Sequence, residues 1–93
     1  MSHPKYLHTQ SNRLYFRRRV PGLSTIFRPA LTSLRTKDRN KALIWLRTLT
    51  IEFETVFDSF AFLVDPLPDD LLHSYMQLRL KQSVRNLQRE SRI

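Results

Sequence analysis

The sequence predicts an α+β fold: a three-stranded antiparallel sheet packed on a long α-helix, followed by a second C-terminal α-helix. Three observations predict it. Apolar and polar residues alternate in the first third of the chain, apolar residues recur every three to four places from about residue 37, and two prolines then interrupt this second pattern. The chain has 93 residues, enough for one small domain. We expect the sheet and first helix in residues 1–64, and the C-terminal helix with its basic tail in residues 65–93, packing on that domain or on a partner.

The first two strands are predicted at residues 5–9 and 14–20, joined by a turn whose serine and asparagine favour a hairpin. The second strand is rich in aromatic and branched side chains, which suit a pleated surface. Successive side chains of a strand point to opposite faces. One face therefore carries Leu14, Phe16, Arg18 and Val20, and the other carries Tyr15, Arg17 and Arg19.

The third strand follows a loop. Pro21 and Gly22 occupy the second and third places of a predicted type II turn, which ends the second strand. The third strand is then expected at residues 30–35, where the pattern alternates again. One face would carry Leu31, Ser33 and Arg35, and the other Ala30, Thr32 and Leu34.

The first helix is predicted from about Lys37, with Thr36 or Asp38 as its N-terminal cap. Its main apolar stripe consists of Ala42, Leu46, Leu49, Phe53, Val56 or Phe57, and Phe60. A second apolar group on the same helix contains Ile44, Trp45 and Ile51. A helix with two apolar faces is expected to bury one on the sheet and the other on the C-terminal helix or on a partner.

The second helix is predicted after Asp65-Pro66-Leu67-Pro68, because proline cannot continue the backbone hydrogen bonds of the first helix. Pro68 suits the first turn, and the two aspartates after it suit the positive N-terminus of a helix. One side of this helix carries Leu72, Met76, Leu80, Val84 and Leu87. An adjacent stripe carries Lys81, Arg85, Arg89 and Arg92. We interpret it as a solvated face, in preference to a nucleic-acid contact or to pairing with the acidic block around Glu52, Glu54 and Asp58.

The charge is unevenly distributed along the chain. There are 16 Lys and Arg against 8 Asp and Glu, for a net charge of +8. Residues 1–50 hold eleven basic residues and one acidic residue, whereas residues 51–78 hold six acidic residues and no Lys or Arg. A basic N-terminal half favours a polyanionic partner, most often nucleic acid. RNA shares this argument but favours exposed aromatic residues for stacking, for which Tyr6 and Tyr15 are the evident candidates.

Composition disfavours several other functions. The chain has no cysteine, which excludes disulfides and thiolate metal sites, and its single glycine excludes glycine-rich phosphate loops. His3, His8 and His73 lack the spacing of a zinc site and no catalytic grouping is evident, so we expect no metal, no cofactor and no enzyme activity. No apolar run is long enough to span a membrane. We therefore expect a cytoplasmic protein without membrane binding.

Two motifs carry a resemblance to a known family. The segment LYFRRRVP at residues 14–21 precedes SLRTKDRNKAL at residues 33–43. In this order and spacing the motifs resemble the N-terminal domain of phage-type tyrosine recombinases (integrases), over roughly residues 5–60. The resemblance implies a three-stranded sheet backed by a helix, which binds arm-type DNA sites by laying the sheet in the major groove. It also implies a part in site-specific recombination or its regulation in a phage or mobile element.

The chain departs from a full integrase, which continues into a core-binding domain and a catalytic domain. Tyr75 lacks the partner residues of a nucleophile, so we expect no strand-transfer chemistry. Two alternatives stay open. The chain is either an N-terminal piece of an integrase, or a stand-alone protein that kept the DNA-reading module and acts as a directionality factor or a repressor.

We therefore expect double-stranded DNA to bind on the sheet face. The residues expected to read or grip the groove are Tyr15, Arg17, Arg19, Ser33 and Arg35, and those expected to hold phosphates around it are Arg13, Arg28, Lys37, Arg39 and Lys41. The alternative is a protein-interaction module, an inhibitor or adaptor, that docks a protein partner or a second copy through its apolar and acidic helix surface. Its candidate surface is Ile44, Trp45 and Ile51, which are otherwise expected in the core.

Overall fold

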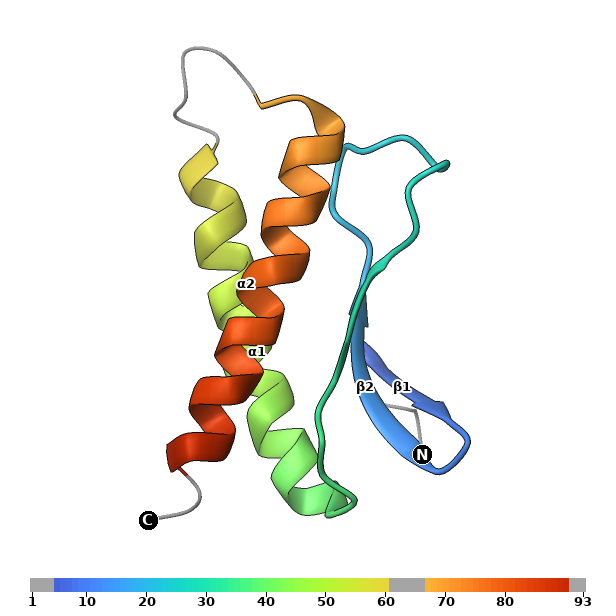
Figure 1. The fold of residues 1–93 in the computed structure, drawn as a ribbon, viewed down its shortest axis with the longest axis vertical. Coiled ribbons are helices and arrows are strands. Elements are labelled where there is room, and N and C mark those ends of the chain that lie inside the picture. Colours follow the sequence, from blue (N-terminus) through green and yellow to red (C-terminus); the bar gives the residue numbers. More distant parts are fainter. Residues whose placement is uncertain (1–4, 61–66, 91–93) are drawn as a thin grey trace.

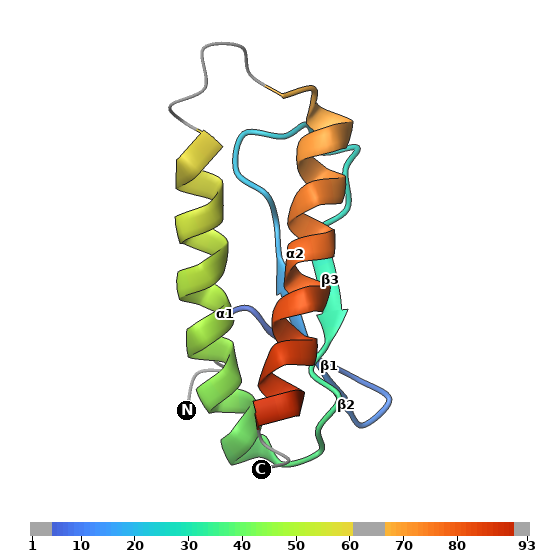
Figure 2. The same cartoon turned by 60° about the vertical axis from the view of Figure 1, so that its left-hand side comes forward.

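The computed structural model describes residues 5–60 and 67–90, which form an α+β fold (Figure 1). Strands β1 (Leu7–Gln10), β2 (Arg13–Arg18) and β3 (Ala30–Ser33) make one antiparallel sheet in the order β1-β2-β3. Helices α1 (Arg39–Ser59) and α2 (Asp69–Glu90) lie side by side against this sheet (Figure 2). The predicted fold class is confirmed. No helix within the described ranges is long and apolar enough to cross a membrane.

The loop between β1 and β2 is shorter than predicted, because strands at residues 5–9 and 14–20 would leave four residues between them. Gln10 pairs with Arg13, so Ser11 and Asn12 alone form the loop. Their φ values are 52° and 64°, and a type I′ turn requires such a pair of positive values. This turn matches the twist of the two flanking strands, which is why the pairing continues to the last residue before it.

The alternation predicted for the second and third strands is confirmed. In β2 the side chains of Leu14 and Phe16 are buried, whereas that of Arg17 is exposed. In β3 the buried residues are Ala30 and Thr32. This strand ends at Ser33 and does not extend to residue 35 as predicted, because Arg35 has a φ of 55°, far from extended geometry.

The first helix begins two residues later than predicted, because Asp38 is its N-terminal cap. The Asp38 backbone is extended, and its carboxylate accepts hydrogen bonds from the amides of Asn40 at 3.0 Å and Lys41 at 3.2 Å. Thr36, the other predicted cap, accepts the Asp38 amide on its hydroxyl at 3.2 Å. The two residues therefore act in succession, with Thr36 orienting the residue that caps α1.

The hydrophobic core lies between the sheet and the two helices. Its buried members are Ala42, Trp45, Leu46, Leu49 and Phe53 of α1, Met76, Leu80 and Val84 of α2, and Leu7, Leu14, Phe16, Val20, Ala30 and Leu34 of the strands and their flanks. The ring of Phe16, which is fully buried, lies 6.2 Å from that of Phe53. The apolar stripe predicted on the second helix thus packs against the rest of the domain.

The start of the second helix also differs slightly from the prediction. Pro68 precedes α2, and its carbonyl accepts the Leu72 amide at 3.0 Å. Pro68 therefore stands immediately before α2, and not inside its first turn as predicted. His3, Arg92 and the Asp65-Pro66 part of the predicted helix break lie outside the described residues.

Candidate nucleic-acid interface

One face of the sheet, which we call the open face, points away from the helices and is polar and basic. It carries His8 and Gln10 of β1, Arg13, Tyr15 and Arg17 of β2, and Leu31 and Ser33 of β3. Tyr15 pairs with His8 on one side and with Ser33 on the other, so these three side chains form a row across the sheet. The rings of His8 and Tyr15 lie 6.1 Å apart. None of the residues that the three strands place on this face is acidic.

A surface cavity of about 460 Å³ adjoins the open face at the end where β2 begins and β3 ends. Its lining residues are Arg13, Leu14, Ser33, Arg35, Thr36 and Lys37, three of which are cationic and none acidic. Cations gathered around a concave surface produce a positive potential that attracts phosphate groups. Four of the residues predicted to contact DNA, Arg13, Ser33, Arg35 and Lys37, therefore meet in one place.

Arg35 is held in an uncommon backbone conformation beside this cavity. Its φ of 55° lies in the left-handed region, which residues other than glycine rarely adopt. Two side chains hold it there: Ser33 Oγ accepts the Arg35 amide at 3.1 Å, and Gln88 Nε2 donates to the Arg35 carbonyl at 3.4 Å. Local strain of this kind persists where the surroundings determine the conformation, and it is frequent at functional sites.

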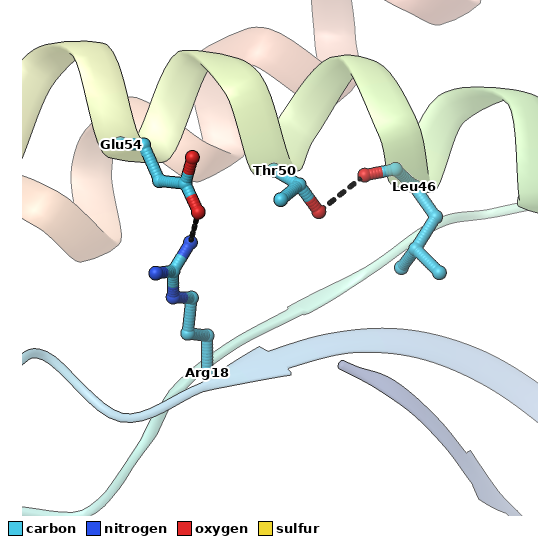
Figure 3. A network of polar contacts seen from close by, with 4 residues as sticks. All are labelled: Arg18, Leu46, Thr50 and Glu54. Atoms are coloured by element: carbon cyan, nitrogen blue, oxygen red, sulfur yellow. Dashed lines mark hydrogen bonds and ion pairs between the residues drawn. The ribbon is translucent and has the colours of Figure 1, made fainter. Parts of the chain in front are cut away.

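The middle residue of the three consecutive arginines stabilises the fold. Figure 3 shows Arg18 pointing from β2 to α1, where Nη1 lies 3.2 Å from Glu54 Oε1. The guanidinium carbon also lies 4.5 Å from the ring centres of both Tyr6 and Phe53, and the side chain is only 13% exposed. Arg18 therefore joins the sheet to α1, as its predicted place on the apolar face implies.

Arg19 and Arg28 lie at the other end of the sheet from the cavity. Arg19 Nη1 donates to the carbonyl of Phe27 at 3.1 Å and so bridges the loop between β2 and β3. Arg28 is exposed in the same loop. Both lie next to the pair of Arg18 and Ala30, which is at one end of the β2–β3 pairing. The cavity lies at the other end, next to the pair of Tyr15 and Ser33. The structure thus separates these two predicted contacts from the four that line the cavity.

The first turn of α1 holds the remaining predicted phosphate contacts. Arg39 is exposed. Lys41 is partly buried, and its Nζ lies 5.8 Å from the centre of the Trp45 ring, a cation–π distance. Neither side chain lines the cavity, whose last lining residue, Lys37, precedes α1 by two residues.

The predicted partner surface divides between core and solvent. Trp45 is buried, with 7% of its surface exposed, and belongs to the core. Ile44 and Ile51 are each 65% exposed, so α2 does not cover them. A second exposed apolar stripe, which was not predicted, consists of Leu71, Tyr75 and Leu78 of α2. Their spacing of four and three residues is the signal that places them on one side of the helix.

A family model with the description "Domain of unknown function (DUF6538)" matches residues 6–61. The matched segment contains the sheet and α1, and therefore the open face and the cavity beside it. Comparisons with curated proteins and with solved structures gave no match. Since the family model covers more than half of the sequence, the chain belongs to the DUF6538 family.

Proposed function

We propose that the chain binds double-stranded DNA with the open face of its sheet, in site-specific recombination or its regulation. The observation that carries the proposal is the continuous cationic surface formed by the open face and the adjoining cavity. Arg13 belongs to both, Arg17 lies on the face, and Arg35 and Lys37 line the cavity. No acidic residue of the described strands or of the cavity lining interrupts this surface.

The dimensions of the sheet suit the major groove. Neighbouring strands lie about 4.8 Å apart, so the axes of the two outer strands are about 10 Å apart. The major groove of B-DNA is about 12 Å wide and admits β-strands. Arg13 and Arg17 are four residues apart on one strand, which is about 13 Å, or roughly four base steps. Each guanidinium can donate two parallel hydrogen bonds to a guanine edge or to a phosphate.

The motifs that resemble integrases coincide with the proposed interface. The first motif forms β2 and the turn after it, and the second runs from the end of β3 into α1. The second motif thus supplies Ser33, Arg35 and Lys37 to the cavity. This agreement supports a recombination context, in which a small arm-site binder acts with, or against, a recombinase.

Fluorescence anisotropy on duplexes of about 30 base pairs tests the proposal across a salt series, with one duplex from the genomic neighbourhood and one scrambled. We expect tighter binding to the native duplex and a steep fall in affinity with salt. Arg13→Gln with Arg17→Gln should lower the affinity at least about tenfold. The matched control, Arg47→Gln with Arg79→Gln, removes the same charge from exposed positions on the two helices. Equal losses in the two double variants would contradict a specific role of the open face.

A second candidate function, docking of a protein partner or a second copy, is favoured by one observation. Ile44 and Ile51 are exposed and seven residues apart, so they lie on the same side of α1. Their replacement by serine should preserve folding and abolish self-association in analytical ultracentrifugation. A wild-type chain that sediments as a monomer, at concentrations where it binds DNA, would contradict docking of a second copy.

A further inference from the structure

The second helix is held along the outer edge of β3 by three polar side chains. His73 and Gln88 donate to backbone carbonyls on either side of β3, at 2.7 Å and 3.4 Å, and Gln77 makes two hydrogen bonds with the backbone of Leu31. Figure 2 shows α2 running beside β3. These contacts determine which side of α2 faces the strand.

Lys81 and Arg85 lie on that side, because they follow Gln77 by four and eight residues. A groove of about 270 Å³ lies between them and the end of β3. Its lining residues are Leu31, Thr32, Ser33, Arg35, Lys81, Val84 and Arg85. The groove therefore combines the end of the sheet with α2, a helix outside the segment that the family model matches.

The ionisable residues of this groove are all cationic. They are Arg35, Lys81 and Arg85, and within residues 5–60 and 67–90 none of them forms an ion pair. Within these described ranges an ion pair joins Arg18 to Glu54, and it lies on the helix side of the sheet, away from the groove. Three unpaired cations around one groove repel each other, and an anion that enters the groove relieves this repulsion.

The groove continues the cavity beside the open face. Ser33 and Arg35 line both hollows, so these lie on the two sides of the end of β3. Together the two hollows have five cations, Arg13, Arg35, Lys37, Lys81 and Arg85, and no acidic lining residue. One small anion occupies one hollow, whereas a polymer with regularly repeated phosphates can occupy both.

We propose that this groove holds backbone phosphates of the same DNA duplex that the open face contacts, with Lys81 and Arg85 as phosphate-binding residues. The inference rests on the proposed function and extends the interface from the sheet to α2. The sequence pattern alone predicts that Lys81 and Arg85 lie on a solvated face, whereas this proposal gives both a contact with DNA phosphates. Arg35, fixed in its left-handed conformation between the two hollows, contacts the phosphates on both sides.

The test compares two double variants with equal net charge. Lys81→Gln with Arg85→Gln removes the proposed contacts, and Arg47→Gln with Arg79→Gln removes two exposed cations elsewhere on the helices. Binding to the native duplex is followed across a salt series. The slope of log affinity against log salt should fall by about 1.8 in the first variant, because each lost phosphate contact contributes about 0.9. The control should keep a slope close to that of the wild type.

The outcomes separate this inference from the proposed function. If the wild type shows no salt-dependent binding to duplex DNA, both are wrong. If Arg13→Gln with Arg17→Gln abolishes binding while the Lys81 and Arg85 variant matches its control, the open face is the interface and the groove is not part of it. Thermal unfolding followed by circular dichroism should give the same midpoint for both helix variants, since all four replaced side chains are exposed.

Discussion

Gln77 of α2 takes the place of a neighbouring strand beside Leu31 of β3. The Leu31 amide donates to Gln77 Oε1 at 2.9 Å, and Gln77 Nε2 donates in return to the Leu31 carbonyl. A primary amide offers the same donor and acceptor as a peptide group, so one side chain satisfies both backbone groups. Because β3 is at the edge of the sheet, these groups would otherwise have only solvent as a partner.

Removal of this amide should therefore destabilise the fold. We expect Gln77→Leu to lower the free energy of unfolding by about 1–3 kcal/mol, because two backbone groups lose their partner beside an apolar side chain. Urea unfolding measures the change. Gln82→Leu, at an exposed position of the same helix, is the control and should change it by less than about 0.5 kcal/mol. An equal effect of the two variants would show that the Leu31 backbone does not depend on Gln77.

Arg17 and Arg18 should separate binding from stability. Arg18→Gln removes the ion pair with Glu54 and the stacking on two aromatic rings, and we expect a loss of about 1–2 kcal/mol in unfolding free energy. Its DNA affinity should stay close to that of the wild type. Arg17→Gln should do the opposite, because its side chain is exposed on the open face. Thermal unfolding and anisotropy on the same preparations measure both effects, and a variant that changes both quantities together would contradict the division of roles.

The left-handed conformation of Arg35 predicts an unusual response to glycine. Arg35→Gly and Arg35→Ala both remove the guanidinium and should weaken DNA binding equally. Only glycine adopts a φ of 55° without steric cost, so Arg35→Gly should be more stable than Arg35→Ala by about 1 kcal/mol. Urea unfolding of the two variants makes the comparison. If alanine is as stable as glycine at this position, the strained conformation does not persist in solution.

The two apolar groups of α1 should differ strongly in their effect on stability. Leu46 is buried in the core, and Leu46→Ala should cost about 2–5 kcal/mol. Ile51 is mostly exposed, and Ile51→Ala should change the unfolding free energy by no more than about 0.5 kcal/mol. Chemical denaturation of both variants tests this difference. A large cost at Ile51 would mean that another surface covers it in solution.

Local patterns were sufficient to predict that the three strands exist and which side chains lie on the open face, although not where each strand ends. Because side chains alternate between the two faces of a strand, Tyr15 and Arg17 lie on one face and Leu14 and Phe16 on the other, independently of the rest of the fold. The cap of α1 is equally local, since Asp38 bonds to amides two and three residues later. The hairpin was predicted from Ser11 and Asn12 in the same way, whereas its two-residue loop and type I′ turn were not.

Properties that depend on tertiary packing could not be predicted in this way. Trp45 and Ile44 are adjacent apolar residues about 100° apart on one helix, and only the position of the sheet and of α2 decides which is buried. The roles of Lys81 and Arg85 likewise depend on the return of α2 to the edge of β3. The hydrogen bonds that hold α2 at this edge join residues 45 to 53 positions apart in the sequence, and a periodic pattern of apolar residues does not predict such pairs.

These separations in sequence also imply an order of folding. The paired residues of the hairpin are only three to nine positions apart, from Gln10 with Arg13 to Leu7 with Phe16. Closing a short loop costs less entropy and takes less time than joining segments some fifty residues apart. We therefore expect the hairpin to form early and β3 to remain uncovered until α2 arrives, so a nascent chain exposes this strand edge to other chains until residue 88 has been synthesised and docked.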